Sequence, residues 1–217
     1  MSREWNHRLV ESYDRVAERY ADRFFRELDG KPFDRDLLDR YGESLKNRGR
    51  VCDLGCGPGH VAAYLRSRGV DVFGLDISPH MLEVAGRLNP SIPFLQGDMV
   101  ALELPDMSLD GVVAFYSLIH LARSVVPTAL AGINRVLAPC GSFLLAVHGG
   151  EGEVHADEVL GEAVALDATL FQPGEMTGYL EGAGFVVDEV FSRAPYESES
   201  QTQRIYVWAT KAGPCLS

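Results

Sequence analysis

Three glycines at alternate positions, Gly55, Gly57 and Gly59, follow directly after the short apolar run of residues 51–54. Glycine reaches positive φ easily and has no Cβ, so a ligand can approach the main-chain N–H groups of such a segment closely. The residues that follow have helical periodicity, and the N-terminus of a helix favours negatively charged groups. The segment is therefore expected to form a strand, a ligand-binding turn and the start of a helix.

The glycine spacing differs from that of dinucleotide-binding proteins. Their fingerprint is G-x-G-x-x-G, and its third glycine would fall where this chain has His60. A nicotinamide or flavin dinucleotide therefore fits the turn less well. An NAD-dependent dehydrogenase is a disfavoured alternative, which a binding titration would test.

A second candidate binding residue is Asp76, at the end of the strand predicted over residues 70–75. It lies about twenty residues after the glycines, where a carboxylate can accept hydrogen bonds from both ribose hydroxyls of an adenosine. Ser78 and Pro79 are typical of an N-cap and a first helical position. An aspartate before a helix is more often a cap or a solvated turn, so the ribose role depends on the glycine turn that precedes it.

The strand, Asp53, the three glycines and the helix together resemble the first motif of the class I S-adenosylmethionine (SAM) dependent methyltransferases. The resemblance covers roughly Tyr13 to Thr210 and is strongest from Asp53 to His120. It implies an α/β, Rossmann-like, doubly wound sheet of seven strands in the order 3-2-1-4-5-7-6, with strand 7 antiparallel and helices on both faces. It also implies SAM as methyl donor, S-adenosylhomocysteine (SAH) as product, and these cofactor-binding residues: Tyr20, Asp53, Gly55, Cys56, Gly57, Gly59, Asp76, Ile77, Asp98, Met99 and Phe115.

The resemblance gives some of these residues specific roles. It assigns Asp98 to the adenine amino group and Met99 to the ring face, where a thioether packs favourably. It places Tyr20, or as a second choice Tyr13, over the methionine end of SAM. Both tyrosines lie in a predicted amphipathic helix from about residue 9 to 28, which is expected to be a lid or a packing helix. The alternative for each aromatic residue is simple packing on the domain.

The chain is expected to be a single methyltransferase domain over residues 1–217. Residues 1–46 are predicted to form an N-terminal helical cap, and residues 50–148 the SAM-binding core. Residues 151–172 are acidic and rich in helix-favouring side chains, so they are predicted to be a helical insert that covers the substrate.

Two histidines, His120 and His148, follow predicted strands at the cofactor edge of the sheet. Methyl transfer needs a base only when the acceptor is a phenol, alcohol or ammonium that must lose a proton. Histidine is the side chain whose ordinary pKa suits this task near pH 7. Both are therefore candidate catalytic residues, against the alternative of hydrogen-bonded scaffold histidines. His60 and His80 stand at predicted helix starts and are expected to be structural.

The composition limits the partners. The net charge of −11, without a block of Lys and Arg, disfavours a nucleic-acid substrate because such binding depends on cationic contacts. No apolar run reaches the ~20 residues that span a bilayer, and the first ten residues are too polar for a secretory signal. We expect a cytoplasmic protein that acts on a small molecule, without a membrane partner, as a monomer or homodimer.

The four cysteines, at positions 52, 56, 140 and 215, lack the paired spacing of a zinc site. They are expected to be reduced thiols, and no metal site is predicted. The leading function is methylation of a small organic acceptor at O, N or C. The alternative is a SAM-binding regulatory or scaffold protein without transferase activity, which would form no SAH in the presence of acceptors.

Overall fold

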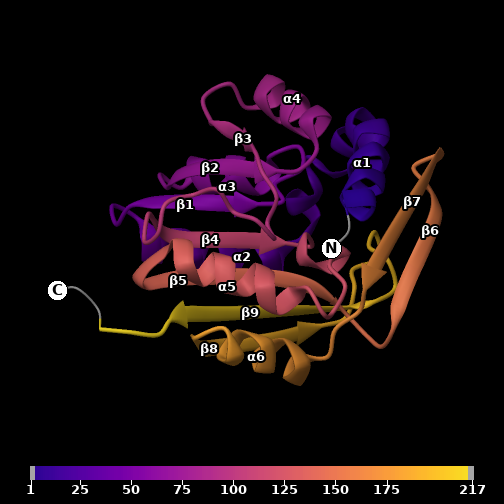
Figure 1. Cartoon of the computed structure of the whole chain (residues 1–217). Coiled ribbons are helices and arrows are strands. Elements are labelled where there is room, and N and C mark those ends of the chain that lie inside the picture. Colours follow the sequence, from indigo (N-terminus) through magenta and orange to yellow (C-terminus); the bar gives the residue numbers. More distant parts are fainter. Residues whose placement is uncertain (1–2, 215–217) are drawn as a thin grey trace.

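A seven-stranded sheet runs through the computed structural model, which describes residues 3–214. In chain order its strands are β1 (Arg50–Leu54), β2 (Asp71–Asp76), β3 (Phe94–Gln96), β4 (Leu109–Phe115), β5 (Leu137–Gly149), β8 (Phe185–Arg193) and β9 (Gln203–Lys211). Their spatial order is β3-β2-β1-β4-β5-β9-β8, and β9 is antiparallel to both of its neighbours. Since β6 and β7 form a separate hairpin, β8 and β9 take the sixth and seventh places in the chain. The predicted fold class and strand order are confirmed (Figure 1).

Helices cover both faces of the sheet, with α2 (Pro32–Leu45) and α3 (His60–Ser67) on one face and α5 (Val126–Val136) and α6 (Pro173–Gly182) on the other. Figure 1 shows α5 and α6 in front of the sheet. A strand covered on both faces needs apolar side chains on both. In β4, Val112 faces the core under α5 and α6, whereas its neighbour Val113 faces the core under α2 and α3.

The long helix α1 (Arg3–Phe24) lies apart from these layers, at the edge where the parallel strands end (Figure 1). It packs on α4 (Pro79–Leu88) through a small separate core of Val16, Ala17, Ala21, Met81 and Val84. Short 3₁₀ turns follow at η1 (Glu27–Gly30) and η2 (Leu118–His120). The two helices of the predicted cap therefore have different positions, because α2 covers the sheet and α1 covers its edge.

The insert between β5 and α6 is a hairpin of two strands, β6 (Glu153–Val159) and β7 (Glu162–Thr169). The prediction of a helical insert over residues 151–172 is wrong. Alanine and glutamate favour helices, but strand formation depends strongly on the neighbouring surfaces. Here β7 lies along α1 (Figure 1), and the backbone N–H of Ala165 donates to the Ser12 hydroxyl at 3.1 Å.

The prediction that all four cysteines are reduced thiols is only partly correct. Cys52 and Cys56 are buried free thiols, whereas Cys140 is disulfide-bonded, so the prediction of a reduced thiol is wrong there. Cys215 lies outside the described residues. Within residues 3–214, no helix is long and apolar enough to cross a membrane.

The buried hydroxyl of Tyr41 joins α2 to the middle of the sheet. It is 2.8 Å from the carbonyl oxygen of Val112 and 3.0 Å from that of Ser142, on two neighbouring strands. Tyr41→Phe leaves these carbonyls without that donor and is expected to lower the free energy of unfolding by about 1–3 kcal/mol. Tyr64→Phe is the control, because the partner that it loses is the half-exposed Asp39. In chemical denaturation this variant should lower the free energy of unfolding by less.

Candidate active site

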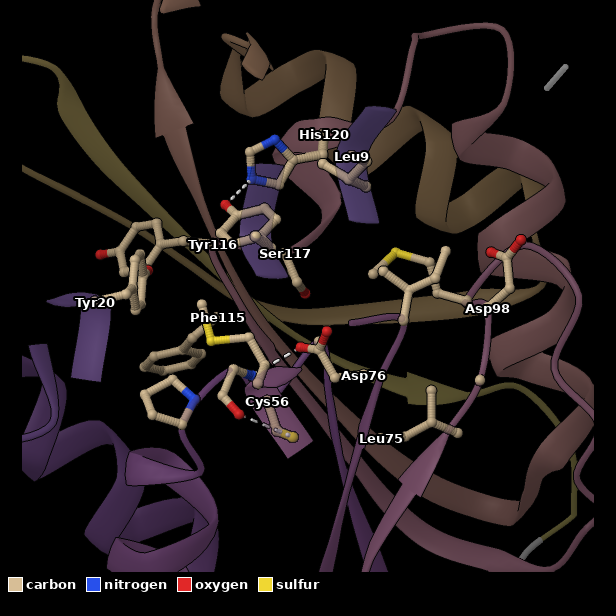
Figure 2. A pocket seen from close by; sticks show the side chains of 18 of the residues that line it. Leu9, Tyr20, Cys56, Leu75, Asp76, Asp98, Phe115, Tyr116, Ser117 and His120 are labelled. Carbon is tan, nitrogen blue, oxygen red and sulfur yellow. Dashed lines mark hydrogen bonds between the residues drawn. The ribbon is translucent and has the colours of Figure 1, made fainter. Parts of the chain in front are cut away.

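A cavity lies at the carboxyl ends of the parallel strands, where ligands bind in open α/β sheets. Its walls come from α1 and from the segments that follow β1, β2, β3 and β4. Figure 2 shows Asp76 on its floor between Asp98 on one side and Tyr20 with Tyr116 on the other. A neighbouring cavity shares Leu75, Ile77, Gly97 and Asp98 with it and adds Asn6 to the lining.

The three glycines of the turn have positive φ, of 72°, 51° and 80°, and they serve different purposes. A Cβ on Gly55 would come within 2.3 Å of Ser117, and one on Gly59 within 2.7 Å of Phe94. A Cβ on Gly57 would meet no atom within 4 Å. Gly55 and Gly59 therefore allow close packing, whereas Gly57 keeps open space in front of the turn. Gly55, Gly57 and Cys56 line the cavity as predicted, but Gly59 does not.

The carboxylate of Asp76 ties this turn to the end of β2. One oxygen accepts from the backbone N–H of Gly57 at 2.8 Å and the other from that of Ser78 at 2.9 Å. Burial raises the pKa of Asp76, while these backbone donors lower it. A carboxylate has about four lone-pair sites, so acceptor capacity remains for hydroxyls in the cavity. Asp76 thus has both a structural role and a binding position.

Asp53 lies beneath the turn and does not line the cavity. Its carboxylate is 2% exposed and accepts from the backbone N–H of Ala62 in the first turn of α3, at 2.9 Å. Burial raises the pKa of Asp53 to about 7, against the opposing effect of nearby His60. The structure corrects the prediction of direct contact, because Asp53 supports the helix start from below.

At the other end of the cavity, Asp98 accepts two hydrogen bonds, from the Asn6 amide at 2.7 Å and from the backbone N–H of Val100 at 2.8 Å. Asn6 was not predicted as a site residue. Because the Asp98 carboxylate only accepts, the Asn6 nitrogen faces it, and the buried Asn6 Oδ1 is left without a partner. Nothing in the first turns of a polar helix signals such a role in the sequence.

His120 is held from both ring nitrogens. Nδ1 is 2.8 Å from the carbonyl oxygen of Asp167, which can only accept, so Nδ1 carries the hydrogen. Nε2 is 2.5 Å from the Tyr13 hydroxyl oxygen and accepts from it. Burial lowers the pKa of His120 and raises that of Tyr13, so both are neutral near pH 7. The pair faces the cavity, where the neutral imidazole is a competent proton acceptor.

His148 is not on the cavity, contrary to the prediction for a catalytic residue. Its ring packs on Tyr116 with centroids 5.1 Å apart, and Nδ1 is 2.8 Å from the Thr202 hydroxyl. Burial and the neighbouring Arg204 lower the pKa of His148 to about 4. Tyr116 separates this imidazole from the site, which gives His148 a supporting position.

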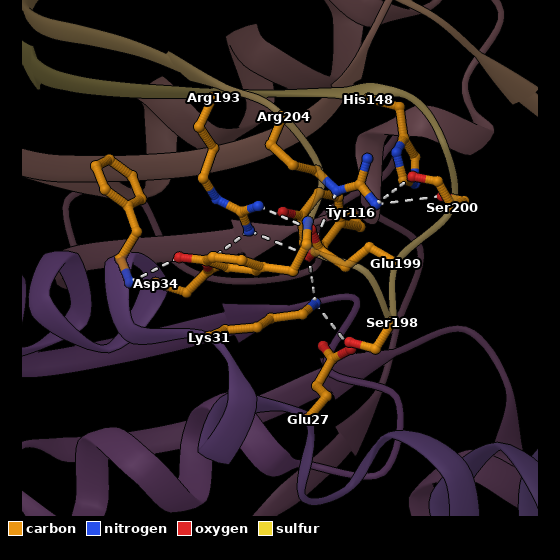
Figure 3. A network of polar contacts seen from close by, with 12 residues as sticks. Glu27, Lys31, Asp34, Tyr116, His148, Arg193, Ser198, Glu199, Ser200 and Arg204 are labelled. Carbon is orange, nitrogen blue, oxygen red and sulfur yellow. Dashed lines mark hydrogen bonds and ion pairs between the residues drawn. The ribbon is translucent and has the colours of Figure 1, made fainter.

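A charged network fixes Tyr116 from behind (Figure 3). The ring lies 5.3 Å from Lys31 Nζ and 5.6 Å from the Arg204 guanidinium carbon, and its hydroxyl is 3.0 Å from that of Tyr206. Glu199, 4% exposed, pairs with Lys31 at 3.1 Å and with Arg193 at 2.7 Å. Burial raises the pKa of Glu199, but Arg193 and the other donors lower it to about 2. Tyr116 itself has a φ of 55°, which is unusual for a non-glycine residue.

The remaining predicted residues fall on the cavity: Tyr20, Ile77, Asp98, Met99 and Phe115 line it together with Asp76 and His120. The prediction missed further lining residues, namely Leu9, Pro58, His60, Leu75, Met81, Gly97, Tyr116, Ser117 and Leu121, and gave Tyr13 only as a second choice. Most of these are chain neighbours of predicted residues. Leu9 and Met81 come from the helix pair α1 and α4, whose packing the sequence pattern does not specify.

A family model described as a methyltransferase domain matches residues 51–141, from β1 into β5. This segment contains the glycine turn and the two aspartates of the cavity, and the strand order of the whole sheet agrees with the same family. Residues 51–141 thus match the methyltransferase domain, and the whole chain has the fold of the class I SAM-dependent methyltransferases.

Individual relatives match different parts of this chain. The malonyl-[acyl-carrier protein] O-methyltransferase of Serratia marcescens is 38% identical over 95 residues, which are 44% of this chain and 36% of that protein. An uncharacterized methyltransferase of Geobacillus kaustophilus is 25% identical over 94% of this chain and 92% of its own length. The solved DhpI–SAH complex superposes with a TM-score of 0.75 and 22% identity over 99% and 100% of the two chains. The first curated relatives are matched over only 35% to 44% of their length.

The residues of the cavity fit the cofactor of this family. Among residues 3–214, buried side-chain polar atoms without a partner occur at Asn6 Oδ1 and His60 Nδ1, and both residues line the two joined cavities. Unpaired buried acceptors are costly unless a ligand satisfies them. In the same part of the chain, no group of three or more His, Cys, Asp or Glu side chains could hold a metal ion.

Gly57→Ala is expected to weaken SAH binding about 10-fold or more, because the new Cβ enters the open space in front of the turn. The matched control is Gly69→Ala, since Gly69 also has positive φ and open space but lies away from the cavity. Both variants should lose about 1–2 kcal/mol of stability from backbone strain. Calorimetric titration should separate them, and equal SAH affinities would contradict the role of Gly57.

Proposed function

We propose that this protein transfers the methyl group of SAM to a small organic acceptor in the cytoplasm. The observation that carries the proposal is the combination, in one cavity, of the open turn at Gly57, the carboxylates of Asp76 and Asp98, and the neutral Tyr13–His120 pair. The first three suit a nucleoside with a charged tail, and the last suits proton removal. Net charge, at −11, opposes a nucleic-acid partner.

In this proposal the binding residues are arranged along the cavity. Asp76 accepts hydrogen bonds from the ribose hydroxyls, while Asp98 and Asn6 face the adenine amino group and Met99 its ring. Tyr20 covers the methionine end together with Phe115. Burial raises the pKa of Tyr20 far above neutral pH, so this wall remains uncharged.

Bound SAM supplies a methyl group activated by its sulfonium. The protein contributes alignment and the exclusion of water, since Tyr20, Phe115 and Tyr116 surround that part of the cavity. For an acceptor that must lose a proton, His120 Nε2 receives it, either directly after Tyr13 turns aside or through the Tyr13 hydroxyl. The hydrogen bond from Nδ1 to the Asp167 carbonyl keeps Nε2 free of hydrogen and oriented toward the cavity.

The acceptor is proposed only as a class. The names of relatives point to different substrates, malonyl-[acyl-carrier protein] for the Serratia marcescens protein and demethylmenaquinone for one from Renibacterium salmoninarum. In this chain the walls near His120 are Leu9, Tyr13, Tyr116 and Leu121, which are apolar or neutral. We therefore propose a small, uncharged acceptor with an ionisable O–H or N–H group.

Asp76→Ala should weaken SAH binding by ~10-fold or more, because each hydrogen bond to a buried carboxylate contributes measurably to affinity. Asp71→Ala, an exposed aspartate at the opposite end of the same strand, is the control and should bind SAH normally. Circular dichroism must show that both variants fold, since Asp76 also holds the turn. Unchanged SAH affinity in folded Asp76→Ala would refute the ribose assignment.

His120→Ala should lower kcat by ~10²- to 10⁴-fold while SAH affinity stays near its original value. The base works when neutral, and burial places its pKa below 6.5, so kcat should be constant above pH 7 and fall as the pH drops through that lowered value. The acidic limb should vanish in His120→Ala. If turnover and the limb both survive, alignment alone carries the reaction.

A further inference from the structure

His60, the first residue of α3, lines the cavity beside the glycine turn. Its side chain is 13% exposed, and Nε2 is 3.1 Å from a carboxylate oxygen of Glu27. The other ring nitrogen, Nδ1, is buried and has no partner. A structural histidine, as expected from the sequence, would have both nitrogens satisfied, so the bare Nδ1 requires another explanation.

The partner of Nε2 determines the chemistry of Nδ1. Burial raises the pKa of Glu27, but its hydrogen bond to His60 and the charge of Lys31 lower it to about 2, so Glu27 is ionised. An ionised carboxylate only accepts, and Nε2 therefore carries the hydrogen. In the neutral imidazole Nδ1 then has a lone pair, which makes it a hydrogen-bond acceptor without a protein donor.

The position of His60 selects the donor. SAM has hydrogen-bond donors at the adenine amino group, the ribose hydroxyls and the α-ammonium of its methionyl end. The first two belong with Asp98 and Asp76, and His60 lies beside the glycine turn next to Glu27, whose charge acts on Tyr20 as well. The ionised carboxylate of Glu27, which pairs with His60, favours a cation at this end.

We propose that His60 Nδ1 accepts a hydrogen bond from the α-ammonium group of SAM, with Glu27 as the positioning residue that fixes the imidazole tautomer. This inference rests on the proposed function and assigns the methionyl subsite of the same cavity. It makes the Glu27–His60 pair a determinant of cofactor specificity, which distinguishes SAM from adenosine derivatives without an amino group.

The test uses calorimetric titration of wild type and His60→Leu with four ligands. They are SAH, 5′-methylthioadenosine, the SAH analogue without its carboxylate and the SAH analogue without its amino group. His60→Leu should bind SAH and the decarboxylated analogue about 10-fold or more weakly, and the other two normally. His80→Leu, an exposed histidine in the first turn of α4, is the matched control and should match wild type for all four.

The outcomes distinguish a failure of the proposed function from a failure of the His60 assignment. If wild type binds none of the four ligands, the proposed function fails. If wild type binds SAH and His60→Leu binds it equally well, only the assignment of His60 fails. The assignment is also overturned if His60→Leu loses affinity only for the ligands that retain the carboxylate. In that case His60 would donate a hydrogen bond to that carboxylate.

A measurement on the wild-type protein keeps the test independent of any variant that does not fold. Nitrogen-15 NMR of the His60 ring in the SAH complex should show a hydrogen on Nε2 and none on Nδ1. A protonated Nδ1 in that complex would overturn the proposal. Glu27→Gln should weaken SAH binding without changing that of 5′-methylthioadenosine, since the amide can satisfy Nε2 as donor and release the tautomer.

Discussion

The architecture of the site depends on one backbone constraint, three positive φ angles within the five residues Gly55 to Gly59. This conformation brings the N–H groups of Gly55 and Cys56 to the carbonyl of Leu75, at 2.7 and 3.2 Å, so the turn is attached to the end of β2. The next residue of β2, Asp76, completes the attachment through Gly57. The shape of the turn and the orientation of the carboxylate are therefore determined together, and neither can change without the other.

Features set by local pattern were predictable. The glycine spacing, the aspartates at strand ends and the alternation of buried segments specify the sheet, and parallel strands must present their carboxyl ends at one edge. For that reason Asp76, Asp98, Phe115 and His120 meet in one cavity although they come from separate segments. The exception within the motif is Asp53, whose type and spacing are those of a ligand residue but whose side chain turns beneath the helix.

Features set by contacts between distant segments were not predictable. The composition of residues 151–172 favours a helix, and only packing against α1 explains the two strands found there. His120 and His148 have similar positions after strands, yet η2 turns the first into the cavity while Tyr116 stands in front of the second. The unpaired nitrogen of His60 depends on Glu27, 33 residues earlier, and no spacing rule connects them.

The attachment of α1 has a consequence for the order of events during synthesis. Arg15, Arg19 and Arg23 reach backbone carbonyls of Ala163, Leu160 and Ser198, which lie 148, 141 and 175 residues further along the chain. The glycine turn and Asp76 leave the ribosome long before these carbonyls do. In a nascent chain the apolar side of α1 can pack on α4 as soon as residue 88 has emerged, whereas these arginine contacts, and with them the final position of α1 over the cofactor edge, form only after almost the whole chain has been made.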